Sequence, residues 1–303
     1  MNFQQLVTTE FGTRAWLALG AVPPRMGYAF GRWLTRQLYR RKQGFVYRVL
    51  YENQKRVLGP EATHEAVDAA VGAVLRHAGI TNYDMVRVLR GGEPAIVNAI
   101  DLNAQFWPAF RAAHARGRGV LICGAHLSNF NLGFLAFAAQ SDIPLQVLSA
   151  AVDAGGFAVV SELRSRGSLE DTQISAASLK QALTRLRGGG VVLIGVDWPV
   201  PDPRDHVSFF GEPSLLSSGF IRLALNSGAL IMPLGTRWSP DRGYYAMTCP
   251  ALEVERTGDR DRDVSVNAGR IISIVEGWIR EAPDQWLMYH PVWPPSDLAT
   301  PQL

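Results

Sequence analysis

The sequence predicts an α/β fold with a central, mostly parallel sheet flanked by helices and an N-terminal helical extension. From residue 118 onward, short runs of β-branched and other apolar residues alternate with helical stretches, whereas the first 117 residues show only helical patterns. Strands that alternate with helices of this length form parallel sheets. Because no linker or internal repeat interrupts the chain, we expect one domain of 1–303. Its sections are a basic amphipathic helical segment (1–60), further helices (61–117) and an α/β core (118–293).

Glycine and proline set the limits of the expected elements. One helix is expected within 24–58, a second from Glu61 or Thr63 to His77, and a third around 95–115. Gly59-Pro60 separates the first two, and Gly91-Gly92 with Pro94 precedes the third. The expected strands are 118–125, 144–150, 191–197, 229–235 and 244–249. The remaining helices are expected near 129–140, 155–166, 175–187, 214–227 and 263–281.

The composition is that of a folded enzyme from a reducing compartment. The 303 residues include 47% hydrophobic ones, which is enough to build a large core. Cys123 and Cys249 both lie in apolar runs and are expected to be small buried hydrophobes, not a disulfide or a metal site. The chain has no G-x-S-x-G, H-E-x-x-H or C-x-x-C motif. We therefore expect neither a metal nor a bound cofactor.

Positive charge is concentrated at the N-terminus. The first 60 residues carry ten Arg or Lys against Glu10 and Glu52, a net +8, so the total of +3 leaves the remainder at −5. The longest apolar stretch there, 15–22, is far shorter than the roughly 20 residues that span a bilayer, so no transmembrane helix is expected. Trp and Tyr alternate with arginines, a pattern that favours a surface lying on an anionic membrane.

That pattern predicts a cytoplasmic protein bound peripherally to the inner face of the cell membrane. An alternative interpretation is an ordinary amphipathic helical hairpin that packs on the core and presents a solvated, arginine-rich face. No nucleic-acid partner is expected, because no nucleic-acid-binding module accompanies the charge.

His126 follows directly on the first apolar strand and precedes an expected helix. In open α/β sheets, functional groups gather where strands end. A histidine there can remove a proton from a hydroxyl if its other ring nitrogen is held by a partner, and Asn131 is within reach. The same rule selects Asp197, which ends the strand 191–197. The alternative for His126 is a purely structural role. The alternative for the segment DWPVPDPRDH (197–206) is a proline-stiffened surface loop whose aspartates cap turns.

At these residues the chain resembles the lipid A late acyltransferases of the lauroyl and myristoyl type and the related phosphatidylinositol mannoside acyltransferases, within the glycerolipid acyltransferase superfamily. The G-x-H-x-x-N-(W/F) pattern of the family is met at Gly124, His126, Asn129 and Phe130. The similar segments follow the family's order from about 45 to 293. They are VYRVLYENQKRVLG (46–59), GAHLSNFN (124–131), LRSRGSLE (163–170), VVLIGVD with VSFFGEP (191–197, 207–213), GALIMPLGTRW (228–238) and IREAPDQWLMYHPVW (279–293).

The resemblance implies an acyltransferase in which His126 acts as general base. The acyl chain would come from an acyl carrier protein or coenzyme A thioester and pass to a hydroxyl or amine of a lipid-like acceptor. Two positions depart from the family pattern: Asn131 replaces the family's acid, and Trp198 replaces a glutamine or arginine. An amide supplies no charge, so Asp197 or Asp202 is the expected substitute, with Asp205 on the same loop.

The resemblance also implies substrate-binding residues outside the catalytic group. Arg164 and Arg166 are two residues apart, a spacing that suits bidentate phosphate recognition. The FFGEP segment (209–213) is expected to precede a helix that begins near Ser214, so that its backbone amides could approach an anion or a carbonyl. An exposed arginine pair and ordinary core phenylalanines are the alternatives. The expected substrate contacts are Asn129, Arg164, Arg166, Phe210, Gly211 and Glu212.

Two other functions stay open at this point. Asn131 is compatible with a non-catalytic relative that binds lipid or a carrier protein. The missing membrane anchor favours an acyltransferase that acts on a soluble or carrier-bound acceptor.

Overall fold

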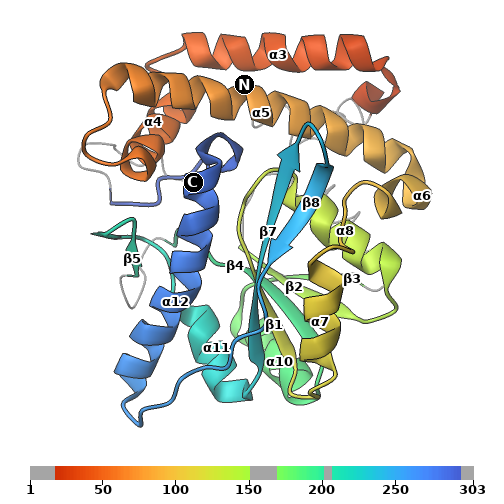
Figure 1. The fold of residues 1–303 in the computed structure, drawn as a ribbon, viewed down its shortest axis with the longest axis vertical. Coiled ribbons are helices and arrows are strands. Elements are labelled where there is room, and N and C mark those ends of the chain that lie inside the picture. The colour runs from red at the N-terminus through yellow and green to blue at the C-terminus, as the bar shows by residue number, and fades with distance from the viewer. Residues whose placement is uncertain (1–17, 151–168, 201–206, 295–303) are drawn as a thin grey trace.

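The computed structural model describes residues 18–150, 169–200 and 207–294. A six-stranded sheet of order β3-β2-β4-β1-β7-β8 forms its centre, and only β7 and β8 pair antiparallel (Figure 1). The predicted α/β fold with a mostly parallel sheet is therefore confirmed. The strands are β1 (Val120–Gly124), β2 (Leu145–Ser149), β3 (Leu169–Gln173), β4 (Val191–Gly195), β7 (Leu230–Ser239) and β8 (Gly243–Thr248).

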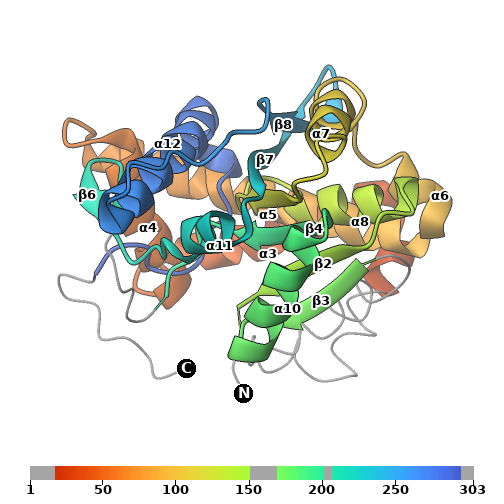
Figure 2. The ribbon, with the colours of Figure 1, turned by 90° about the horizontal axis from the view of Figure 1, so that it is seen from below.

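Alternate residues of the central strands supply two separate hydrophobic cores, one on each face of the sheet. Leu121 and Cys123 of β1 face one core, while Val120 and Ile122 face the other. The first face is covered by α10 (Ala176–Arg187), α11 (Gly219–Ser227) and α12 (Arg260–Glu281). The second face is covered by α7 (Phe106–His114) and α8 (Phe130–Gln140), as Figure 2 shows from below.

A layer of helices lies across one end of the sheet (Figure 1). It contains η1 (Leu19–Ala21), α3 (Pro24–Arg40), α4 (Phe45–Leu58), α5 (His64–Arg90) and α6 (Gly92–Val97). Glycines allow α3 and α5 to pack closely, since a Cβ built on Gly31 would lie 2.6 Å from the Gly79 carbonyl oxygen. Asn129, beside the end of β1, donates to the Thr81 carbonyl and so ties the sheet to α5.

Several element boundaries differ from the expectations. The helix predicted to end at His77 continues to Arg90, and the one expected around 95–115 is two helices, α6 and α7. The strand β3 was not predicted, and 155–166 lies outside the described residues. The helix expected from Ser214 begins at Gly219, because the preceding residues form a hairpin of β5 (Ser208–Phe209) and β6 (Glu212–Pro213).

Candidate active site

The sheet brings His126 and Asp197 together. Strands β1 and β4 are parallel neighbours, with Gly124 and Gly195 as partners in register, and each polar residue follows two positions after its glycine. Gly195 leaves room for the imidazole, because a Cβ there would lie 3.1 Å from His126 Cε1. The carboxyl ends of two adjacent parallel strands therefore place a histidine and an acid side by side.

Asp197 is fully buried and holds His126 through two hydrogen bonds. The Nδ1 atom of His126 lies 2.6 Å from Asp197 Oδ1, and the backbone N–H of His126 donates to Oδ2 at 2.9 Å. Burial alone would raise the pKa of the Asp197 carboxyl, but the adjacent imidazole and the hydrogen bonds onto the carboxylate lower that pKa below its ordinary value. Asp197 is therefore ionised at neutral pH. When the ring proton sits on Nδ1, the Nε2 atom is left to accept a proton.

Aromatic rings flank the imidazole. Phe130, the first residue of α8, lies edge-on with its centroid 4.6 Å from that of His126, and Trp198 lies 5.2 Å away. Trp198 also contacts His290, with centroids 4.3 Å apart. Burial and the nearby His126 lower the pKa of His290, which favours its neutral form. The His126 side chain keeps 18% of its surface exposed, so the ring lies at a partly open position lined by aromatic groups.

The segment after α12 closes the site from behind. The indole Nε1–H of Trp286 donates to Asp197 Oδ2 at 2.9 Å, and the N–H of Leu287 donates to the His126 carbonyl at 3.0 Å. Asn53 of α4 is buried and donates to the carbonyls of Met288 and His290 at 3.1 and 3.0 Å. Residues distant in the chain thus fix the loop that carries His126.

The predicted catalytic residues have different outcomes. Of the residues expected to orient the imidazole, Asp197 holds its Nδ1 atom. The role expected of Asn131 remains a prediction. Asp202, Arg164 and Arg166 lie outside the described residues. Their expected roles remain predictions.

The predicted substrate contacts inside the described residues all have contacts within the protein or lie in a turn, and their expected roles remain predictions. Asn129 is 5% exposed, and its amide is bound to α5. Phe210 and Gly211 form the turn of the β5-β6 hairpin with φ values of 50° and 82°. The Phe210 amide donates to Glu276, and exposed Glu212 pairs with Arg56. The FFGEP amides are therefore at a hairpin turn and not at a helix N-terminus.

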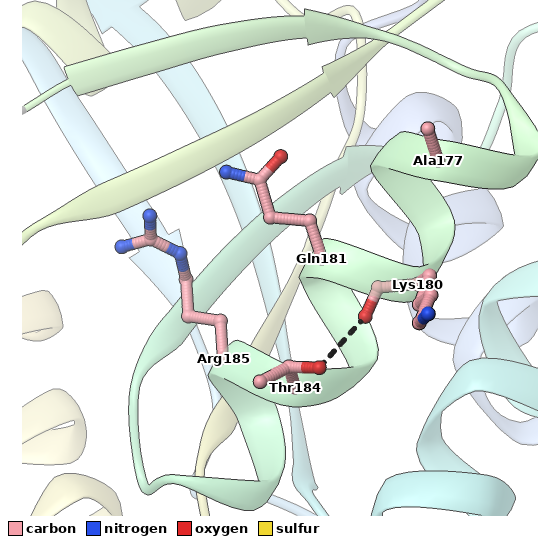
Figure 3. Close-up of a pocket in the computed structure, with 5 residues that line it drawn as sticks. All are labelled: Ala177, Lys180, Gln181, Thr184 and Arg185. Carbon is pink, nitrogen blue, oxygen red and sulfur yellow. Dashed lines mark hydrogen bonds between the residues drawn. The ribbon is translucent and has the colours of Figure 1, made fainter.

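The two pockets described on the surface lie apart from the His126 ring. A shallow one is lined only by residues of α10, among them Gln181 and Arg185 (Figure 3). A second, of about 520 Å³, lies between α4 and the C-terminal segment and includes Tyr51 and Trp293.

Cys123 is fully buried, as expected, and burial raises the pKa of its thiol, while Cys249 is only half-buried.

Comparison with known proteins decides the family. The family model of bacterial lipid A biosynthesis acyltransferases matches residues 2–294, nearly the whole chain. The chain belongs to this family. It is therefore an acyltransferase of lipid biosynthesis, as its resemblance to the lipid A late acyltransferases predicted. No curated protein matches the chain significantly.

Sequence reasoning on this acyltransferase missed part of the site. Gly195 and Trp286 both lie against the His126–Asp197 pair, and neither was predicted. The only signal for Trp286 was the similarity of the segment 279–293 to the closing segment of the family. Within the part of the chain that the structure describes, no helix is long and apolar enough to cross a membrane. Among the same residues, no three His, Cys, Asp or Glu side chains gather closely enough to hold a metal ion.

Proposed function

We propose that the protein transfers a fatty acyl chain from an acyl carrier protein or coenzyme A thioester to a hydroxyl or amine of a lipid-like acceptor. The observation that carries the proposal is the 2.6 Å contact between His126 Nδ1 and the fully buried, ionised Asp197. This contact supplies the charge that Asn131 lacks. The alternative of a non-catalytic relative that binds lipid or a carrier protein was suggested by Asn131 alone, and this contact weakens it.

In the proposed reaction, His126 Nε2 takes the proton of the acceptor hydroxyl or amine as that group attacks the thioester carbonyl. Asp197 stabilises the imidazolium that forms, since the ring proton on Nδ1 already donates to its carboxylate. The N-terminal turn of α8 begins beside the ring, and its positive dipole end favours the oxyanion of the tetrahedral intermediate. When the C–S bond breaks, the imidazolium returns its proton to the thiolate. The products are the acylated acceptor and the free thiol, and no covalent acyl-enzyme is needed.

The amides of residues 126–128 are already used and are not oxyanion donors in this arrangement. The N–H of His126 donates to Asp197, that of Leu127 to the Ala125 carbonyl, and that of Ser128 to the Gln285 carbonyl at 2.7 Å. Stabilisation of the oxyanion is therefore expected from the start of α8, from its N-cap residue Asn129 onward, or from groups that approach when the substrates bind.

The test compares His126→Ala with His114→Ala, a histidine of α7 outside the site. Both proteins are given palmitoyl-coenzyme A or palmitoyl-acyl carrier protein together with a bacterial lipid extract, and acylated lipids are measured by mass spectrometry. Loss of the general base is expected to lower turnover by at least about 100-fold, whereas His114→Ala stays near wild type. Full activity of folded His126→Ala would contradict the proposal.

We further propose that α3 lies on the anionic inner surface of the cell membrane. Its outer face exposes Met26, Phe30 and Trp33, with 62%, 44% and 56% of their surfaces accessible. These positions are spaced so that they share one helix face. Exposed arginines accompany them at positions 25, 32, 36 and 40. Apolar rings that enter the headgroup region, combined with cations that attract anionic lipid, are typical of interfacial helices.

A flotation assay separates this location from the alternative with a soluble acceptor. The protein is expected to float with vesicles of phosphatidylcholine mixed with phosphatidylglycerol, and much less with phosphatidylcholine alone. Failure to float with either vesicle would favour the acyltransferase that acts on a soluble or carrier-bound acceptor.

A further inference from the structure

The Asp197 carboxylate has a third hydrogen-bond donor that does not belong to His126. The Trp286 indole N–H reaches Oδ2 at 2.9 Å from a position 89 residues further along the chain. Trp286 is completely buried, and so is the carboxylate. None of the catalytic steps proposed above uses this indole.

A fully buried carboxylate needs donors, because an unsatisfied buried charge is costly. The backbone N–H of His126 and the indole of Trp286 both bind Oδ2, which leaves Oδ1 directed at the imidazole Nδ1. Three donors from two separate segments therefore fix the rotation of the carboxylate group. Without the indole, the hydrogen bonds from described residues to the Asp197 carboxylate all come from His126, the residue that it is proposed to orient.

The Trp286 ring is itself held rigidly. It packs edge-on against Phe209 at 5.8 Å and against Trp293 at 6.4 Å between centroids. The neighbouring backbone pairs with the His126 loop, since Leu127 and Trp286 form a bridge between the two segments. A rigid donor of this kind keeps its geometry while the charge on the imidazole changes during the reaction.

We infer that Trp286 is a positioning residue for acyl transfer, which acts by orienting the Asp197 carboxylate and by setting the proton affinity of the His126–Asp197 pair. This inference rests on the proposed general-base function. The positive end of the indole N–H dipole points at the pair and opposes the uptake of a further proton. Among the described residues, His290 is a titratable group near the pair, and Trp198 lies between it and His126.

The experiment uses Trp286→Phe, which removes the N–H and keeps an aromatic ring. The matched control is Trp293→Phe, because Trp293 belongs to the same buried cluster but its Nε1–H donates to the Phe209 carbonyl at 3.3 Å. Rates are measured against pH with palmitoyl-coenzyme A and a bacterial lipid extract. For Trp286→Phe we expect kcat to fall about tenfold with KM little changed, because the loss affects the transition state more than binding.

The pH profile separates positioning from simple structural damage. Loss of the dipole raises the proton affinity of the pair, so the acid limb for Trp286→Phe should move upward by about half to one pH unit. The limb for Trp293→Phe should not move. Equal profiles for the two variants would overturn the inference while leaving the general-base proposal intact, provided that His126→Ala is inactive. Full activity of His126→Ala would instead overturn the proposed function itself.

If Trp286→Phe does not fold, a measurement on the wild-type protein tests whether Trp286 is coupled to the His126–Asp197 pair. In the wild-type protein, the proton resonance of Trp286 Nε1–H should shift with pH at the same midpoint as the His126 ring, whereas that of Trp293 should stay constant. A Trp286 resonance that does not respond to the His126 transition would overturn the inference.

Discussion

The active site and the outer face of α3 break the usual rule of burial in opposite ways. At the active site a carboxylate, Asp197, is completely buried, while on α3 an indole, Trp33, exposes 56% of its surface. Charges are rarely buried without partners, and large apolar groups are rarely exposed in clusters. The buried charge is compensated inside the molecule by His126 and Trp286. The exposed rings of Phe30 and Trp33 stack on each other and belong to the surface that we propose to face the membrane.

Helix α5 lies between these two regions and contacts both (Figure 1). On one side Asp84 accepts from Tyr28 of α3 at 2.6 Å and from Tyr244 of β8 at 2.7 Å. Further along, His77 contacts Ser128 Oγ at 3.0 Å, next to the His126 loop. A rigid helix thus fixes the position of the proposed membrane-facing surface relative to the site.

The largest effect is expected from Asp197→Asn. An amide leaves the shape of the site almost unchanged but removes the charge that stabilises the imidazolium, so kcat should fall by about a thousandfold or more. Asp142→Asn, which changes an exposed aspartate in the loop between α8 and β2, serves as the control and should have wild-type activity. Steady-state kinetics at saturating thioester provide the measurement. Activity within a few-fold of wild type would mean that the buried charge has no catalytic role.

A smaller loss is expected from Gly195→Ala, because the added Cβ would displace the His126 ring. The ring must move by a few tenths of an ångström, and since a misplacement of about 1 Å can cost about 100-fold in rate, we expect a loss of about tenfold. Gly124→Ala is a matched control, since Gly124 is the register partner of Gly195 and a Cβ there would meet its neighbours at 3.8 Å or more. Equal rates for the two variants would show that the space beside the ring does not matter.

The exposed region is tested by the double variant Phe30→Ala, Trp33→Ala. Loss of two apolar rings from the interface is expected to weaken binding to phosphatidylglycerol vesicles by about tenfold or more. Val266→Ala, at an exposed apolar position on α12, should bind as wild type does. Cosedimentation gives the partition coefficient, and unchanged binding of the double variant would place the membrane contact elsewhere.

The smallest effect concerns stability. Burial lowers the pKa of His77 and of His290, so the folded protein resists protonation that the unfolded chain accepts. Above the ordinary histidine pKa of about 6.5 both states are neutral, and below it stability is lost as the pH falls. Thermal unfolding should show a Tm that decreases on acidification, and less steeply in His290→Gln than in His64→Gln. An identical pH dependence in the two variants would contradict this assignment.

The fold was largely predictable because the core strands and helices carry strong apolar patterns. The edge strand β3 was missed because its sequence, LEDTQ, is polar and only Leu169 is buried. The helix α5 was expected to end at His77, but it continues to Arg90, and Gly79 just beyond that residue permits a close contact with Gly31. Local patterns cannot reveal a glycine that is needed for packing between helices.

The active site was predictable as far as strand ends allowed. His126 and Asp197 were selected because each lies at the end of an apolar strand, but the pairing of β1 with β4, which brings Asp197 to the ring, is a property of the sheet. Trp286 lies far along the chain, and no local pattern links it to Asp197. The hairpin formed by the FFGEP segment was also missed, because its glycine and proline are equally typical of a loop that precedes a helix.

The most direct test of the pair is the tautomer of the His126 ring. Nitrogen-15 NMR of the histidine side chains, with His126 assigned through His126→Gln, reports which ring nitrogen carries the proton when the ring is neutral. We predict a proton on Nδ1, bound to Asp197, and an unprotonated Nε2 that can accept the proton of the acceptor. A ring protonated on Nε2 in the wild-type protein would contradict this prediction.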